Sequence, residues 1–163
     1  MTIVYTDSID ILAEPEQVLR TLGDLKLRGH YYPDGVTGIR EVVERPSSLV
    51  DQFLPGQRVA FNYQGVSREH MIAEVVEWDN AEASIVERPL RNLKSEIIEW
   101  RLSELTMGTV RVTITVSGNY NAIEKIAARS KLKNFWGTTL SRLKSYLEDK
   151  ITYAGPHTFA QNS

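Results

Sequence analysis

The chain has 163 residues, of which 42% are hydrophobic and 25% are charged, and its 19 Lys+Arg against 21 Asp+Glu give a formal net charge of −2. These values are ordinary for a folded domain and exclude a disordered or fibrous chain. A net charge near zero also argues against electrostatic binding of nucleic acid. The sequence contains no cysteine, which excludes disulfide frameworks, thiolate zinc sites and cysteine nucleophiles together.

No segment approaches the roughly 20 consecutive apolar residues that a membrane-spanning helix needs. The first residues, MTIVYTDSIDILAEPE, lack the basic region of a signal peptide and alternate polar with apolar side chains. We therefore expect a cytoplasmic protein without an integral membrane segment. One domain is expected at this length, and we place it at residues 1–150, followed by a C-terminal tail at residues 151–163.

One strand and two short helices are predicted at the N-terminal end. Residues 3–12 alternate as a half-buried strand does. One face of this strand would carry Ile3, Tyr5, Asp7, Ile9 and Ile11. Pro15 suits the first turn of a helix, because its missing N–H costs nothing there. A second short helix is expected at about Asp24–Tyr31, since Tyr32 precedes a proline and so avoids the α region.

Six further strands are predicted in the central part of the chain. They are Gly38–Glu44, Gln57–Tyr63, Ser67–Trp78, Ala83–Arg88, Lys94–Ser103 and Thr109–Ser117. In the last of them Val110, Val112 and Ile114 alternate with polar residues, which favours an antiparallel sheet with one face in water. The strand at residues 67–78 has apolar residues on both faces, so its inward side stays open.

A long helix is predicted from about Ala122 to Asp149. Asn121 suits its N-cap, and Glu124 can complete a capping box. The apolar stripe of this helix consists of Leu132, Trp136, Leu140, Leu143 and Leu147, with Phe135 and Tyr146 widening it. Gly137 costs about 1 kcal/mol in mid-helix and therefore predicts close packing or a bend at that position.

This order of elements predicts an α+β fold in which a curved, seven-stranded antiparallel sheet wraps around the C-terminal helix. The helix is the one element long enough to cover the apolar face of such a sheet. The two short helices after the first strand would close one end. Between helix and sheet lies a space that side chains fill or that remains a cavity, and apolar cavities with a few polar groups commonly bind small ligands.

With these elements in this order, the chain resembles the SRPBCC superfamily, which has the START-like or helix-grip fold, and within it the polyketide cyclase/dehydrase-like branch. The resemblance covers most of the chain and rests on turns and packing residues. Its stretches are SIDILAEPEQVLRTLGDL at residues 8–25, Tyr32-Pro33-Asp34-Gly35-Val36, Leu54-Pro55-Gly56-Gln57-Arg58, Glu77-Trp78-Asp79, Trp100-Arg101-Leu102 and Gly108-Thr109-Val110-Arg111-Val112-Thr113. The resemblance implies a domain that binds a lipid, polyketide or similar molecule, and some members catalyse cyclisation, dehydration or hydrolysis.

Three polar side chains are candidates for catalysis in such a cavity. Arg68 could polarise a carbonyl oxygen, and His70, in mid-strand, could act as a general base. The alternative for His70 is a surface or hydrogen-bonded structural role. Glu96 has the inward parity of Ile98 and Trp100 if the strand extends that far, and otherwise lies in water at a strand end.

A second group of side chains is predicted to line the ligand site. Its members are Tyr32, Tyr63, Trp78, Trp100, Phe135, Trp136 and Leu140, and the alternative for each is packing in the core. The histidines His30, His70 and His157 have no metal-ligand spacing, and no phosphate-binding or dinucleotide-binding glycine loop is present. We therefore expect neither a metal nor a cofactor.

The leading hypothesis is a domain that binds one hydrophobic small molecule between sheet and helix. Two alternatives stay open: a cyclase/dehydrase-type enzyme that acts in the same cavity, and a protein-interaction module whose interior is filled. The expected partner is the small molecule, with no nucleic acid. The sequence leaves the ligand, catalysis and the oligomeric state, including a homodimer, open.

Overall fold

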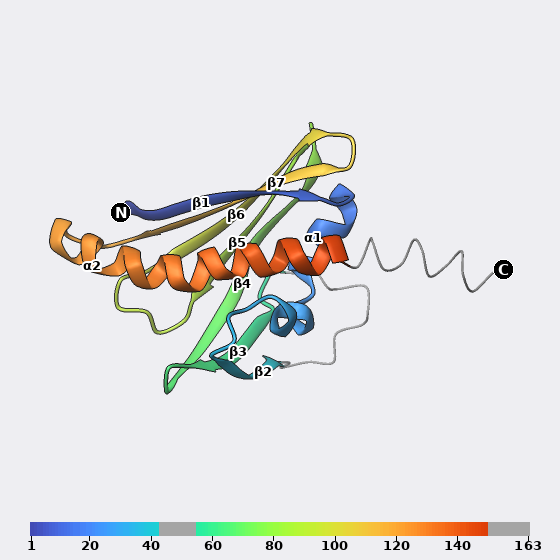
Figure 1. Ribbon diagram of the computed structural model, residues 1–163. Helices are drawn as coiled ribbons and strands as arrows, with labels where there is room; N and C mark the ends of the chain where they lie inside the picture. Colours follow the sequence, from blue (N-terminus) through green and yellow to red (C-terminus); the bar gives the residue numbers. More distant parts are fainter. Residues whose placement is uncertain (43–54, 150–163) are drawn as a thin grey trace.

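Seven strands form one antiparallel sheet in the order β1-β7-β6-β5-β4-β3-β2. The computed structural model describes residues 1–42 and 55–149 (Figure 1). The strands are β1 (Thr2–Leu12), β2 (Val36–Val42), β3 (Arg58–Tyr63), β4 (Val66–Asp79), β5 (Glu82–Pro89), β6 (Ile97–Thr106) and β7 (Thr109–Gly118). The predicted tail at residues 151–163, His157, and the predicted strand end at residues 43–44 lie outside the described residues.

The C-terminal helix lies across one face of this sheet (Figure 1). It begins as α2 (Ala122–Leu132), continues through the π-helical segment η3 (Lys133–Gly137) and runs on to residue 149. The apolar stripe predicted for this helix faces the sheet, where Trp136, Leu140, Leu143 and Leu147 are buried together with Phe135. The α+β helix-grip architecture predicted from the order of elements is therefore confirmed.

Two short helical segments follow β1, as predicted. The first, α1 (Pro15–Gly23), has its proline in the first turn and contacts β4 and β7. The second, η1 (Leu25–His30), is a 3-10 helix whose N-cap Asp24 accepts a hydrogen bond from the backbone N–H of Lys26 at 3.1 Å. It contacts β2 and β3, so the two segments cover different parts of the sheet.

β1 differs from its predicted facing at one end. A register shift against β7 falls between Ile3 and Tyr5. It turns Val4 into the core and leaves Ile3 55% exposed, whereas strict alternation placed Ile3 on the same face as Ile11, which is buried. The extra residue of a bulge reverses the parity of every side chain on one side of it.

β4 has apolar residues on both faces for a similar reason. His70 and Ile72 are buried, and irregularities in the pairing with β5 follow between Ile72 and Glu74 and between Val76 and Asp79. The inward side therefore changes along the strand. No single alternation pattern could have assigned it.

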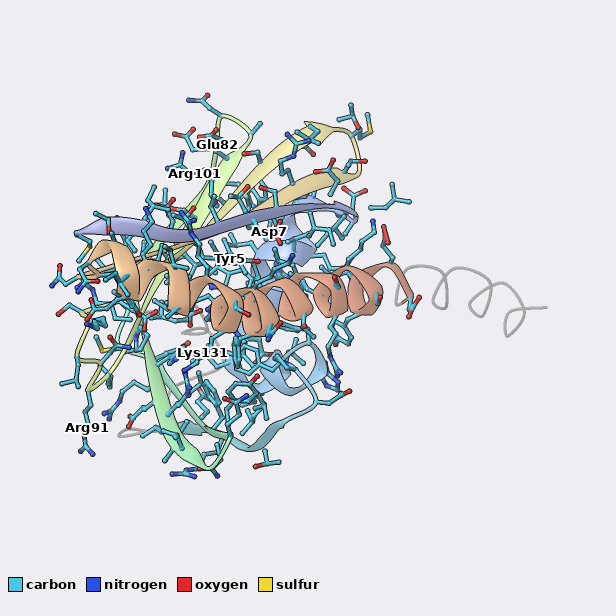
Figure 2. All side chains as sticks on the ribbon, turned by 60° about the vertical axis from the view of Figure 1, so that its left-hand side comes forward. Tyr5, Asp7, Glu82, Arg91, Arg101 and Lys131 are labelled. Atoms are coloured by element: carbon cyan, nitrogen blue, oxygen red, sulfur yellow. The ribbon has the colours of Figure 1, made fainter. Side chains whose placement is uncertain are left out.

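Gly137 sits where the helix packs closely against β1. A Cβ atom on Gly137 would lie 3.2 Å from the Tyr5 hydroxyl oxygen, and Figure 2 shows Tyr5 and Asp7 on β1 beside the helix. The Tyr5 hydroxyl donates to Asp7 Oδ2 at 3.0 Å. The close packing predicted from this glycine is confirmed, and the glycine closes the π-helical turn that carries Phe135 and Trp136.

Candidate functional site

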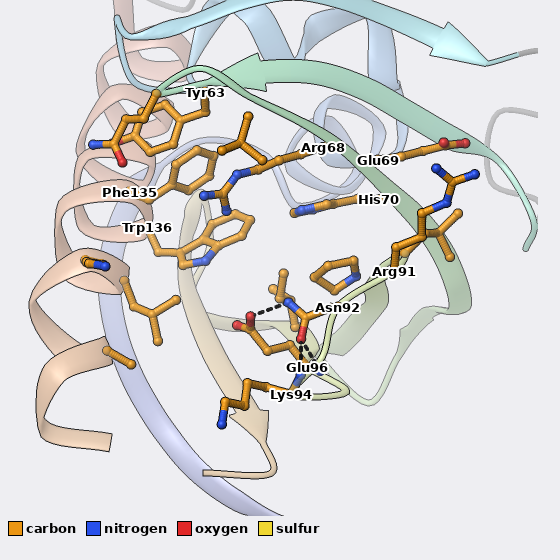
Figure 3. Close-up of a pocket in the computed structure, with 18 of the residues that line it drawn as sticks. Tyr63, Arg68, Glu69, His70, Arg91, Asn92, Lys94, Glu96, Phe135 and Trp136 are labelled. Carbon is orange, nitrogen blue, oxygen red and sulfur yellow. Dashed lines mark hydrogen bonds between the residues drawn. The ribbon is translucent and has the colours of Figure 1, made fainter. Parts of the chain in front are cut away.

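A pocket of about 490 Å³ opens between the first half of the C-terminal helix, the β3–β4 hairpin and the connection from β5 to β6. Figure 3 shows this pocket and most of its lining side chains. The apolar part of the lining consists of Phe61, Tyr63, Ile98, Leu132, Phe135 and Trp136. The polar part includes Arg68, His70, Asn92, Lys94, Glu96, Tyr120 and Lys131. The volume lies within the range of small-molecule sites, roughly 300–1,000 Å³.

An aromatic wall forms one side of the pocket. The ring of Phe135 lies 5.1 Å from Tyr63 and 4.7 Å from Trp136, both edge to face. Phe61 stacks on Phe135 at 6.1 Å. β3 supplies Phe61 and Tyr63, and the π-helical turn supplies the other two rings. π-Helical turns are rare in proteins overall, and those that occur are often found at functional sites. This one places two successive aromatic side chains toward the sheet.

His70 brings a polar group into this aromatic surface. It comes from the inward face of β4, its side chain is 5% exposed, and it lines the pocket. Its ring lies 5.2 Å from Phe61 and 6.2 Å from Trp136. Its Nδ1 lies 3.8 Å from Oε2 of Glu87, which does not itself line the pocket. Among the described residues Nδ1 has no hydrogen-bond partner.

Behind His70 lies a buried ion pair between Arg28 of η1 and Glu87 of β5. Arg28 Nη1 lies 3.1 Å and 3.2 Å from the two Glu87 carboxylate oxygens, and the two side chains are 0% and 1% exposed. The same nitrogen donates to the Tyr32 hydroxyl at 3.0 Å, and Trp100 Nε1 donates to Glu87 Oε1 at 2.7 Å. The buried Glu87 carboxylate therefore has the positive charge of Arg28 beside it and accepts hydrogen bonds from the guanidinium and from the Trp100 indole N–H, with no access to water.

This surrounding keeps Glu87 ionised. Burial acts to raise the pKa of the Glu87 carboxyl, but the Arg28 charge and the donors outweigh it and lower the pKa to about 2. Burial acts against the charge of Arg28 too, and the Glu87 charge holds the pKa of the guanidinium well above its usual value. Burial raises the pKa of Tyr32, so its hydroxyl stays neutral and accepts from Arg28.

The candidate residues predicted from the sequence fall into three groups. Tyr63, Phe135, Trp136, Arg68, His70 and Glu96 line the pocket. Tyr32 and Trp100 support the wall from behind: the ring of Tyr32 lies 5.3 Å from Phe135, and that of Trp100 lies 5.6 Å from Trp136. Leu140 is buried in the core, and Trp78 lies away from the pocket, where its Nε1 donates to the Pro15 carbonyl at 2.9 Å.

Glu96 reaches the pocket from a turn, because β6 begins at Ile97 and not at Lys94. Asn92 shapes this turn: its Oδ1 accepts from the backbone N–H of Lys94 at 2.8 Å, as in an Asx turn. Its Nδ2 donates to Glu96 Oε1 at 2.6 Å. Tyr120 is adjacent, and burial together with the Glu96 charge and hydrogen bond raises the pKa of this tyrosine to about 12.

Sequence reasoning missed Arg28 and Glu87. A signal for Glu87 existed, because it has the same strand parity as the buried Ala83 and Ile85, and a charge at an inward position needs a partner. Nothing local identifies that partner, which lies 59 residues earlier. Within residues 1–42 and 55–149, no cluster of His, Asp and Glu could hold a metal ion, and no helix combines the length and apolarity needed to cross a bilayer.

Solved structures with a similar fold were found, although no family model and no curated protein matches the chain. A hypothetical protein from Helicobacter pylori is 18% identical with a TM-score of 0.65, covering 87% of this chain and 86% of its own. The Aha1 dimer from Colwellia psychrerythraea is 18% identical with a TM-score of 0.60, covering 91% and 97%. The di-domain ARO/CYC BexL from the BE-7585A biosynthetic pathway is 12% identical with a TM-score of 0.63, and the match covers 93% of this chain and 48% of BexL.

These likenesses, all at low identity, concern the fold alone. They agree with the seven-stranded antiparallel sheet and the long helix that lies across it. This chain therefore has the α+β helix-grip fold, in common with the ARO/CYC protein BexL and with proteins of quite different names.

Proposed function

We propose that this protein binds one hydrophobic small molecule in the pocket beside the C-terminal helix. The observation that carries the proposal is the wall of Phe61, Tyr63, Phe135 and Trp136 along a pocket of about 490 Å³. A ligand that buries about 200 Å² of apolar surface gains roughly 5 kcal/mol at about 25 cal/mol per Å², before the costs of association. The helix-grip fold of the ARO/CYC protein BexL supports the same proposal.

The rest of the interior limits the size of the ligand. Tyr32, Trp100 and Leu140 pack together with the helix stripe in one continuous core, so the space for a ligand lies beside the first half of the helix. This arrangement favours a compact molecule over a long one that follows the whole helix. The pocket also weighs against an interaction module with a filled interior. A homodimer stays compatible with the proposal, as the Aha1 dimer is one of the similar structures.

Ala128 offers a way to test the proposal. It lies on α2 and lines the pocket, whereas the neighbouring Ala127 is exposed and does not line it. The neutral fluorophore N-phenyl-1-naphthylamine, which brightens in apolar surroundings, serves as the probe. We expect saturable binding to the wild type, loss of at least tenfold in affinity in Ala128→Trp, and unchanged affinity in Ala127→Trp. A wild type that fails to bind the probe, or an Ala128→Trp variant that binds it equally well, would contradict the proposal.

A second candidate function is an enzyme of the polyketide cyclase/dehydrase type. The observation that favours it is the pair of His70 and Glu87. An ionised Glu87 that faces Nδ1 favours the tautomer with its proton on that nitrogen, which leaves Nε2 as an acceptor for a ligand O–H or acidic C–H. Arg68, in the same pocket, could then stabilise the negative oxygen that forms.

Turnover separates the two functions. An enzyme of this type converts a poly-β-ketone chain in a reaction that slows at least 100-fold in His70→Gln, while the affinity for N-phenyl-1-naphthylamine stays within about twofold of the wild type. Corresponding losses are expected in Arg68→Ala and, to a lesser degree, in Glu96→Ala. Equal product formation with wild type, His70→Gln and buffer would remove the catalytic function and leave the binding function in place.

A further inference from the structure

The side chains that line the pocket include more cations than carboxylates. Four cations line it, namely Arg68, Arg91, Lys94 and Lys131, against the two carboxylates Glu69 and Glu96. The chain as a whole has a formal net charge of −2. A cationic rim on a protein of slightly negative net charge attracts anions to that place specifically, because exposed charges act over about a Debye length of 8–10 Å.

Two of these six charges already have partners. Lys94 Nζ donates to Glu124 Oε1 at 2.6 Å, and Glu69 pairs with Arg58 at 3.1 Å. Glu96 accepts from the neutral amide of Asn92 at 2.6 Å.

The remaining cations have no such neutralisation. Within the described parts of the chain, no carboxylate lies within ion-pair distance of Arg68, Arg91 or Lys131. Figure 2 shows Arg91 pointing outward from its loop and Lys131 on the C-terminal helix, where it lines the pocket. Arg68 and Lys131, which lies four residues before Phe135 on the same helix, are therefore the unpaired cations available to a ligand held against the aromatic wall.

Arg68 is also oriented toward that wall. Its guanidinium carbon lies 5.5 Å from the centre of the Tyr63 ring, and Figure 3 shows the side chain reaching from β4 toward Phe135 and Trp136. A guanidinium stacked on an aromatic ring keeps its N–H edge free for an oxyanion. The aromatic surface and an unpaired cation thus meet at one point of the pocket.

We propose that the ligand is an amphiphilic anion, with an apolar or aromatic body on the Phe135–Trp136 wall and one anionic group bound by Arg68 and Lys131. This inference rests on the proposed binding function and adds the chemical class of the ligand. A carboxylate or sulfonate matches the planar fork of the guanidinium, which binds two oxygens at once. A neutral ligand of the same shape would leave both cations without a partner.

Two fluorophores with one skeleton provide the test. N-phenyl-1-naphthylamine is neutral, and 8-anilino-1-naphthalenesulfonate differs from it by one sulfonate group. We expect the sulfonate to bind the wild type about tenfold more tightly, and this advantage to shrink severalfold in 0.5 M NaCl. Arg68→Gln and Lys131→Gln should each reduce severalfold the ratio of the affinity for the sulfonate to the affinity for the neutral probe, because the neutral probe has no anionic group for either cation. Lys125→Gln, on α2 but outside the pocket lining, serves as the control and should change neither affinity.

The outcomes separate the inference from the proposed function. If both probes bind equally tightly and the two variants change nothing, the anionic ligand class is wrong while the binding function stands. If the sulfonate still binds more tightly than the neutral probe in Ala128→Trp, or in both Arg68→Gln and Lys131→Gln, the anionic group binds elsewhere and the inference is overturned as well. If neither probe binds the wild type, the proposed function itself fails.

Discussion

Replacing Glu87 by glutamine tests whether the buried pair with Arg28 organises the core behind the pocket. The substitution keeps the shape of the side chain and one carbonyl oxygen that can accept from Trp100, but it removes the charge. Arg28, which is 0% exposed, is then left as a charge without a counter-ion in the protein interior. Because Glu87→Gln changes the packing of this network very little, its effect on stability measures the contribution of the charge.

The expected loss follows from burial. Breaking a buried ion pair by removing one partner costs about 3–5 kcal/mol, because the other charge stays desolvated. The Arg111–Asp10 pair provides the contrast, since its atoms lie even closer together, at 2.8 Å against 3.1 Å, while both side chains are 48% exposed. Water solvates the remaining charge in that pair, and Asp10→Asn should therefore cost far less.

Urea unfolding at pH 7, followed by far-UV circular dichroism, measures both variants against the wild type. We expect Glu87→Gln to lose about 3–5 kcal/mol in the free energy of unfolding and Asp10→Asn to stay close to the wild type. The double variant Arg28→Met/Glu87→Leu should recover part of the loss, since apolar replacements of a buried pair are often tolerated. Equal losses in Glu87→Gln and Asp10→Asn would refute the reasoning that burial makes the difference.

Three further predictions follow from named contacts. The pKa of Glu87 is about 2 in the folded protein against 4.5 ordinarily. The stabilising effect of the ionised carboxylate is therefore complete above pH 4.5 and is lost as the pH falls toward 2. Over this window the free energy of unfolding should depend less steeply on pH in Glu87→Gln than in the wild type. Gly137→Ala gains up to about 1 kcal/mol of helix propensity but meets the Tyr5 hydroxyl at 3.2 Å, so thermal unfolding should show stabilisation in a Tyr5→Phe background and little or none in the wild type. Trp78→Phe loses the hydrogen bond to the Pro15 carbonyl and should cost about 1 kcal/mol in urea unfolding, with unchanged affinity for the fluorescent probes because this residue lies outside the pocket lining.

Local patterns were sufficient for most of the secondary structure. The capping box at the start of the long helix is present as predicted, with Glu124 N–H donating to Asn121 Oδ1 and Asn121 N–H donating to Glu124 Oε2, both at 2.9 Å. The pattern failed where one extra residue entered a strand, at Ile3 and in β4. A bulge leaves no compositional signal, because it arises from the pairing with the neighbouring strand.

The pocket was predictable in its residue types but not in its place. Phe135 and Trp136 belong to a stripe that the sequence marks as inward, and His70 stood out as a histidine in mid-strand. Whether Tyr63 or Tyr32 joined them depended on how β3 and η1 pack against the helix. Tyr63 lines the space, and Tyr32 fills the core behind it.

The amino-acid sequence by itself determined the order of the elements, the antiparallel sheet and the apolar face of the last helix, because periodicity, capping and turn residues act between near neighbours along the chain. The tertiary structure alone decided that Arg28 meets Glu87, 59 residues away in the sequence, and that Glu87 faces His70. It also decided that side chains fill the space beside the second half of the helix and that a pocket remains beside its first half. These features depend on register, bulges and a π-helical turn, which are set by contacts between distant segments.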